Sequence, residues 1–149
     1  MMWRLFSRQP AVVQPAPPRG AAADERLTST SIATIEWFSD TAVVTITVTE
    51  LTLDQGLEEL TSTCEELYHR RARHLVLDIQ NVQYMDSACL RCLIETARRF
   101  AQTAGRIALV NPNHTVQYLI KLTRLGRMFP ICNDVMAALT AVERTANPI

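Results

Sequence analysis

Features that would indicate a polyanion-binding or membrane-spanning protein are scarce or missing in this 149-residue chain. Fifteen basic and fifteen acidic residues balance to a net charge of zero, so no overall excess attracts a polyanion such as nucleic acid. No apolar run approaches the roughly 20 residues that a membrane-spanning helix needs. We therefore expect a protein without a nucleic-acid partner and without a membrane span.

Residues that could carry catalysis or bind metal are also few. The three histidines show no ligand spacing with the cysteines, no second C-x-x-C pair exists for zinc, and no G-x-S-x-G turn presents a serine nucleophile. We expect no catalytic residue, no metal site and no cofactor. Four cysteines without a secretory signal favour a reducing compartment, so the predicted location is cytoplasmic. The four are Cys64, Cys89, Cys92 and Cys132.

The beginning of the chain differs in composition from the rest. Residues 8–26 are rich in Pro and Ala, lack aromatic residues and show no helical or strand period, which predicts a disordered tail over residues 1–29. Arg4 and Arg8 interrupt what would have to be the apolar stretch of a signal peptide, which argues against one. The tail holds four of the fifteen basic residues and two of the fifteen acidic ones, leaving eleven basic and thirteen acidic residues elsewhere.

The remaining sequence predicts one domain over residues 30–145, followed by a short end over 146–149. Strand patterns and helical patterns alternate after a first pair of strands, which predicts an α/β fold whose later strands are parallel and joined by right-handed crossovers. One strand, 41–49, alternates Val and Ile with Thr and should have one polar face. Thr52 or Asp54 is the expected cap of the first helix, and Asn133 that of the last. The predicted strands are 32–38, 41–49, 74–79, 105–111 and 128–132, and helices should begin near Leu57, Ser87, Val116 and Val135.

The stretch "QYMDSACLRC" (83–92) lies where a buried strand should end and a long helix begin. With Asp86 as the cap, Ser87 occupies the first helical position, beside backbone N–H groups that have no partner within the helix. A phosphate on Ser87 would meet those donors and the positive end of the helix dipole. From these residues alone two interpretations stay open: a phosphorylation switch at Ser87, or an ordinary helix cap.

Cys89 and Cys92 offer a third interpretation, because thioredoxin-like redox pairs also lie in the first turn of a helix after a strand. The apolar stripe of this helix, predicted to run from Leu90 to Ala104, places Cys92 on the solvent side with Glu95 and Arg99 and Cys89 at the boundary. No aromatic residue precedes the pair and no proline separates it, so thiol chemistry is the less favoured alternative.

Residues 73–139 resemble the STAS domain of bacterial anti-sigma-factor antagonists. The matching motifs are an acid at the end of a buried strand, "MDSACL" for x-D-S-S/T/A-G-L, "AGRIALVNP" for G-G-x-L-x-L-V-N-P, and "IKLTRLGRMFPI" for L-x-x-T-G-L-x-x-x-F-P-I. The match is in register and without gaps over this half, and looser over 32–72. The resemblance implies a STAS-type mixed β-sheet with helices packed against one side.

The resemblance also implies a function. STAS antagonists are non-enzymatic modules whose serine after the aspartate is phosphorylated by a histidine-kinase-like ATPase that is also the anti-sigma factor, and a PP2C-type phosphatase resets them. Carried onto this chain, Ser87 is the phosphoacceptor and Asp86 orients the turn. Ser87, Ala88, Arg91 and Glu95 would form the partner-binding surface. The oligomeric state stays open.

Three residues depart from the family pattern: Cys89 and Arg124 replace glycines, and Arg91 replaces a small residue. Glycines on a docking surface permit close backbone approach, so these changes suggest an altered partner or a lost kinase. Arg91 could instead pair with a phosphate on Ser87, four residues before it. If the kinase is lost, the alternative function is a STAS scaffold without phosphorylation, serving a signalling or lipid-transport assembly.

Overall fold

The computed structural model describes residues 27–145. The predicted tail, up to residue 26, and the end over 146–149 lie outside the described residues. Residues 27–29, predicted to be part of the tail, instead form an edge strand, β1 (Leu27–Ser29). This strand pairs antiparallel with β2, with Leu27 opposite Glu36.

A six-stranded mixed sheet in the order β1-β2-β3-β5-β7-β8 forms the centre of the domain. The first three strands are antiparallel neighbours, and the four from β3 to β8 run parallel. The predicted first pair of strands is therefore confirmed as an antiparallel hairpin that turns at Ser39 and Asp40, and the later strands are parallel as predicted. The remaining strands of this sheet are β2 (Ala33–Phe38), β3 (Thr41–Ile46), β5 (His74–Asp78), β7 (Ile107–Val110) and β8 (Ile131–Cys132).

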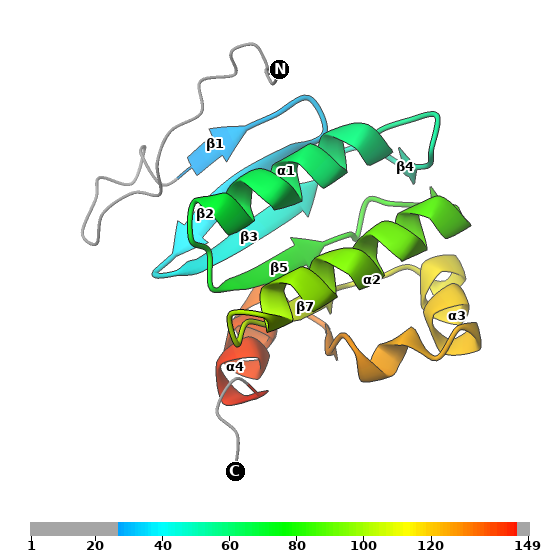
Figure 1. Cartoon of the computed structure of the whole chain (residues 1–149). Helices are drawn as coiled ribbons and strands as arrows, with labels where there is room; N and C mark the ends of the chain where they lie inside the picture. The colour runs from blue at the N-terminus through cyan, green and yellow to red at the C-terminus, as the bar shows by residue number, and fades with distance from the viewer. Residues whose placement is uncertain (1–26, 146–149) are drawn as a thin grey trace.

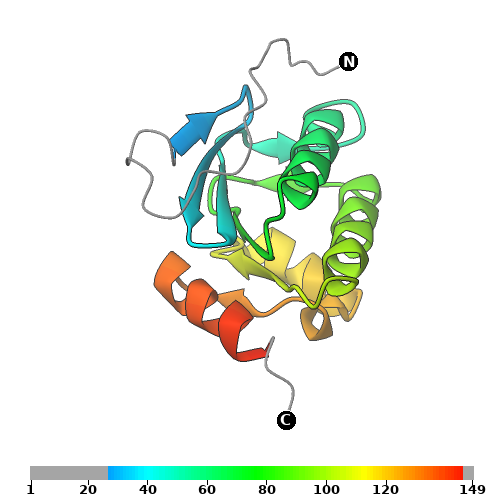
Figure 2. The same ribbon diagram turned by 60° about the vertical axis from the view of Figure 1, so that its left-hand side comes forward.

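Helices cover both faces of the sheet, as Figures 1 and 2 show. On one face lie α1 (Leu57–His69) and α2 (Ser87–Ala101), with α3 (His114–Leu122) and the short 3₁₀ helix η2 (Leu125–Arg127) beside them. On the other face lies α4 (Val135–Thr145), whose Ala138 and Val142 pack with Val43 and Val76.

Two expectations about the sheet are therefore wrong. Helices do not lie on one side only, and the face of β3 that carries Thr41, Val43 and Thr45 is not open to solvent, because α4 covers that side of the sheet and Thr41 and Val43 are buried. Such strands need a cover on both faces. The strand also ends at Ile46 rather than at Thr49.

A second, two-stranded sheet was not predicted. It consists of β4 (Glu50–Leu51) and β6 (Tyr84–Met85), which pair in parallel directly before α1 and α2. Strands of two residues are too short for any period to show. This small sheet ties the chain before α1 to the chain before Ser87.

The helix caps differ from two of the predictions. The N-cap of α1 is Gly56, with φ of 82° and no side-chain cap, instead of Thr52 or Asp54. In α4 the capping carboxylate belongs to Asp134, whose Oδ1 accepts the N–H of Ala137 at 2.7 Å, instead of Asn133. In both places a neighbouring residue reaches the helix terminus better than the expected one.

Candidate functional site

The start of α2 directly follows β6 of the two-stranded sheet, on the face of the six-stranded sheet that α1 and α2 cover. Asp86 has the extended backbone typical of an N-cap, and its Oδ1 accepts the N–H of Cys89 at 2.9 Å. Ser87 is the first residue of the helix, and its side chain is exposed. The predicted cap and the predicted helix start are both confirmed.

Asp86 also holds a second segment of the chain. Its Oδ2 accepts the N–H of Leu53 at 2.9 Å, and its own backbone N–H donates to the carbonyl of Leu51 at 3.3 Å. The bond from Leu53, followed by the bond from Cys89, lowers the pKa of the Asp86 carboxyl below its ordinary value. Asp86 is therefore an ionised anchor that fixes the position of Ser87, and it is not suited to act as a proton donor.

The other residues predicted to bind a partner follow along the outer surface of α2. Arg91 and Glu95 are exposed, and Ala88 is half-buried. Residues 87, 91 and 95 recur at four-residue spacing, which places them on neighbouring positions of one helical face. The structure thus brings all four residues together on one surface beside the N-terminus of α2.

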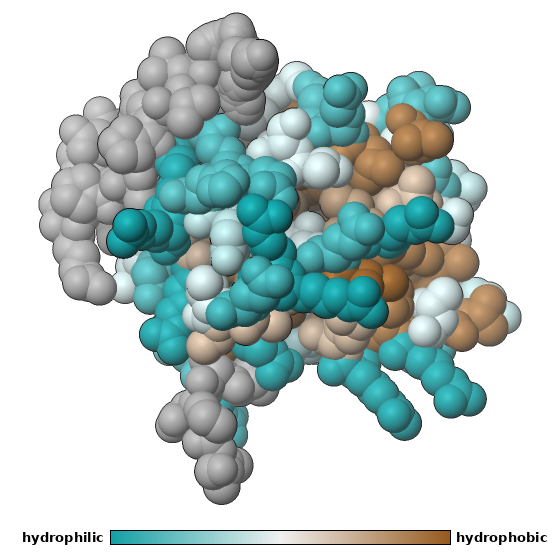
Figure 3. Space-filling view, in the orientation of Figure 1, coloured by the Kyte–Doolittle hydropathy of each residue, from teal (hydrophilic) through white to brown (hydrophobic). Residues whose placement is uncertain are grey.

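Two exposed apolar side chains border this surface and were missed by the sequence analysis. Leu53, which is 72% exposed, follows β4, and Tyr84, which is 49% exposed, lies in β6 two residues before Asp86. In Figure 3 the hydrophobic surface is most extensive on the right, over the end of the molecule where α1 and α2 begin. We call Leu53, Tyr84, Ser87, Arg91 and Glu95 the docking surface. The missed signal was a leucine within the polar turn "LTLDQG", where an apolar side chain has no core to enter.

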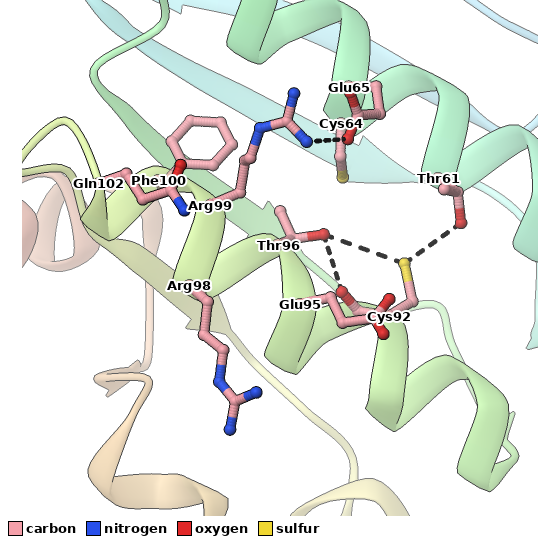
Figure 4. Close-up of a pocket in the computed structure, with 10 residues that line it drawn as sticks. All are labelled: Thr61, Cys64, Glu65, Cys92, Glu95, Thr96, Arg98, Arg99, Phe100 and Gln102. Carbon is pink, nitrogen blue, oxygen red and sulfur yellow. Dashed lines mark hydrogen bonds and ion pairs between the residues drawn. The ribbon is translucent and has the colours of Figure 1, made fainter.

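Both cysteines of the C-x-x-C pair lie in the interior. Cys89 is fully buried, and burial raises its pKa to about 12. The prediction that Cys92 faces solvent is wrong: α1 packs over that side of α2, and the Cys92 sulfur lies 3.3 Å from the hydroxyl of Thr61 (Figure 4). The predicted stripe also ends too late, because Ala101 and Ala104 are exposed. A redox pair needs an accessible thiolate, and these thiols do not provide one.

Because Cys89 is buried, its replacement of the family's glycine does not have the effect on the docking surface that the sequence suggested. A side chain that points into the core adds no bulk to the docking surface, so the replacement of glycine by cysteine leaves the approach to Ser87 open. Arg91 is different, because it is exposed and adds both length and positive charge to that surface. Of the two departures in this turn, only Arg91 alters what a partner meets.

A separate pocket of about 270 Å³ lies between α1 and α2 and is shown in Figure 4. Its wall includes Cys64 and Cys92, and across it Arg99 pairs with Glu65 at 2.9 Å. Within residues 27–145 no group of three or more His, Cys, Asp or Glu side chains is placed to hold a metal ion. In the same range no helix combines the length and apolar character needed to cross a bilayer.

Comparison with known proteins identifies the domain. The family model described as STAS domain matches residues 28–138. The anti-sigma F factor antagonist of Paenibacillus polymyxa is 30% identical over 79 residues, which cover 53% of this chain and 68% of that protein.

Solved structures show the same fold. An anti-sigma factor antagonist from Mycobacterium paratuberculosis is similar with a TM-score of 0.66 at 23% identity, over 74% of this chain and 92% of that one. The Bacillus cell fate determinant SpoIIAA in the phosphorylated form is similar with a TM-score of 0.57 at 18% identity, over 75% of this chain and 97% of that one. These two likenesses concern the fold.

Proposed function

Because the chain belongs to the STAS domain family, we propose that it is an anti-sigma-factor-antagonist-like switch that binds a protein partner and is gated by phosphorylation of Ser87. The observation that carries the proposal is the exposed Ser87 side chain at the first position of α2, held there by the Asp86 carboxylate. The Paenibacillus relative is named an anti-sigma factor antagonist, and SpoIIAA has been solved in a phosphorylated form.

The position of Ser87 explains how a phosphate would act. The group would carry a charge of about −1.5 to −2 and would be placed next to the ionised Asp86. The N–H groups of the first helical turn that Asp86 does not already bind, together with the positive end of the helix dipole, would stabilise it locally, so the modification would leave the fold intact. A partner that meets Leu53 and Tyr84 would instead have to bury part of that charge, which weakens the contact. The phosphate would therefore release the partner without unfolding the domain.

The proposed partner is an anti-sigma factor that is also a serine kinase of the histidine-kinase-like ATPase type, and a PP2C-type phosphatase would remove the phosphate. In this scheme the ATP is bound by the partner, and this chain supplies the acceptor hydroxyl and the docking surface. The proposed location is the cytoplasm, where such partners meet sigma factors.

One observation favours a second function. Arg91 is exposed, four residues after Ser87, and forms no ion pair with any residue that the structure describes. This residue adds length and positive charge where the family pattern has a small side chain, which would hinder docking of the kinase, and Ser87 would then stay unmodified. The chain would act as a constitutive scaffold of a signalling or lipid-transport assembly.

The test is mass spectrometry of the intact protein purified from its own host, at rest and under stress, followed by localisation of the modified residue. We expect a species heavier by one phosphate, located at Ser87 and absent from the Ser87→Ala variant. Ser62→Ala, which removes an exposed serine from α1, should leave that species unchanged. Failure to find the heavier species under every condition would favour the scaffold.

A further inference from the structure

An open groove of about 580 Å³ lies beside the start of α1. It is bordered by the turn between β1 and β2, by the chain from β3 to β4, and by the first turn of α1. Ile32 and Val48 give it apolar walls, and Glu50 and Glu59 bring two carboxylates to it. We call this the acidic groove.

The acidic groove has an excess of negative charge that the described residues do not neutralise. Residues 50–59 contain Glu50, Asp54, Glu58 and Glu59, all exposed, and no Lys or Arg. Glu59 accepts a hydrogen bond from the Ser31 hydroxyl, and within residues 27–145 none of the four forms an ion pair with a cationic side chain. An occupant of this groove should therefore be basic, with apolar side chains for the walls.

The chain itself contains a segment of that chemistry. Residues 1–20 include Arg4, Arg8 and Arg19 and no acidic residue, and Arg4 stands among Trp3, Leu5 and Phe6. The segment joins the domain at Leu27, and β1 leads within four residues to Ser31 on the groove. At about 3.3 Å per residue, the 26 residues before Leu27 are long enough to turn back and reach it.

We propose that residues 1–26 bind the acidic groove of the same molecule. Arg4 and Arg8 would pair with Glu50 and Glu59, and the apolar residues beside Arg4 would contact Ile32 and Val48. This contact does not depend on modification of Ser87, so it can hold or fail independently of the proposed function.

The test is paramagnetic broadening in the full chain. A nitroxide is attached at Ser7→Cys in a Cys132→Ser background, since the other three cysteines are buried. We expect broadening of the amides of residues 47–50 and 55–59, and its loss in the double variant Glu50→Lys/Glu59→Lys. The control Glu36→Lys reverses an exposed acid on β2 outside the groove and should keep the broadening.

A second double variant leaves the groove unchanged, so a groove that fails to fold cannot be mistaken for loss of the contact. Arg4→Glu/Arg8→Glu changes only the N-terminal segment and should also abolish the broadening. Raising the salt concentration should weaken it, because exposed ion pairs are screened. Broadening that is spread evenly over the domain, or that survives both double variants, would overturn the proposal. In a mixing control, an isotope-labelled chain without nitroxide is combined with an unlabelled chain that carries the nitroxide. Broadening as strong as in the singly labelled protein would also overturn the proposal, because the segment would then bind a second copy of the chain.

Discussion

The Asp86 carboxylate accepts the backbone N–H of Leu53 at 2.9 Å, across 33 positions of the sequence. This bond joins the turn before α1 to the first turn of α2, so the apolar Leu53 side chain and the Ser87 hydroxyl are presented by one unit. The Asp86 carboxylate therefore supports the docking surface together with the small β4–β6 sheet, and it does not itself need to touch a partner.

The first prediction concerns the pH dependence of stability. The pKa of Asp86 is lowered in the folded state, so its contribution to stability is complete above the ordinary carboxyl range and is lost as the pH falls through the folded-state pKa. Asp86→Asn should lower the free energy of unfolding at pH 7, and the difference from the wild type should shrink below pH ~4. Urea unfolding at several pH values measures it.

Asp54→Asn is the matched control, because Asp54 is exposed and its carboxylate accepts no hydrogen bond from the residues that the structure describes. It should change stability little at any pH. If Asp86→Asn and Asp54→Asn behave alike at pH 7, the carboxylate of Asp86 does not anchor the two segments.

The second prediction concerns the thiols. Burial raises the pKa of Cys89 to about 12 and that of Cys64 further still, so neither is ionised near neutral pH. In the folded protein, dithiodipyridine should react quickly with no thiol other than the half-buried Cys132. The three buried thiols should react only after unfolding. The Cys132→Ser protein should lose the fast phase. A fast phase that persists there and disappears on Cys92→Ser would restore the redox interpretation.

The third prediction concerns backbone strain at Arg124. This residue has φ of 61°, a conformation that costs a non-glycine residue about 1–2 kcal/mol, and the family pattern has glycine at this position. Arg124→Gly should therefore raise the free energy of unfolding by about 0.5–1 kcal/mol once the added flexibility of the unfolded chain is included. Arg127→Gly, in the short helix η2 that follows Arg124 and without a positive φ, should have no stabilising effect. Equal effects of the two substitutions in urea unfolding would contradict the explanation.

Much of the fold could be predicted from the sequence because its strong patterns coincide with its long elements. The uninterrupted apolar run of β5 and the helical spacing from Leu57 to Leu67 both specify burial directly. The position of α4 could not be predicted, because Val43 and Val76 are apolar in either arrangement and only the packed structure shows which face each residue occupies. The two-residue strands β4 and β6 are set by tertiary contacts and carry no local pattern.

At the site, the cap and the exposed serine were predictable because both follow from the local order Asp-Ser at a helix start. Leu53 was not, because its role depends on a bond to a residue 33 positions later. The orientation of Cys92 was predicted wrongly for a related reason. The sequence analysis assigned only one buried side to α2, the side that faces the sheet. The helix also packs against α1, and this second contact buries Cys92 beside Thr61.

The central claim is that charge on Ser87 ends a protein contact, and the most direct measurement is the affinity of one purified ATPase partner for five forms of the chain. Wild type and Ser87→Ala should bind alike, and Ser87→Asp should bind at least about tenfold more weakly, a loss of about 1.4 kcal/mol. Ser62→Asp, which adds the same charge on α1, should bind as the wild type does. Equal affinity of Ser87→Asp and Ser62→Asp, together with equal affinity of the enzymatically phosphorylated protein, would contradict the account.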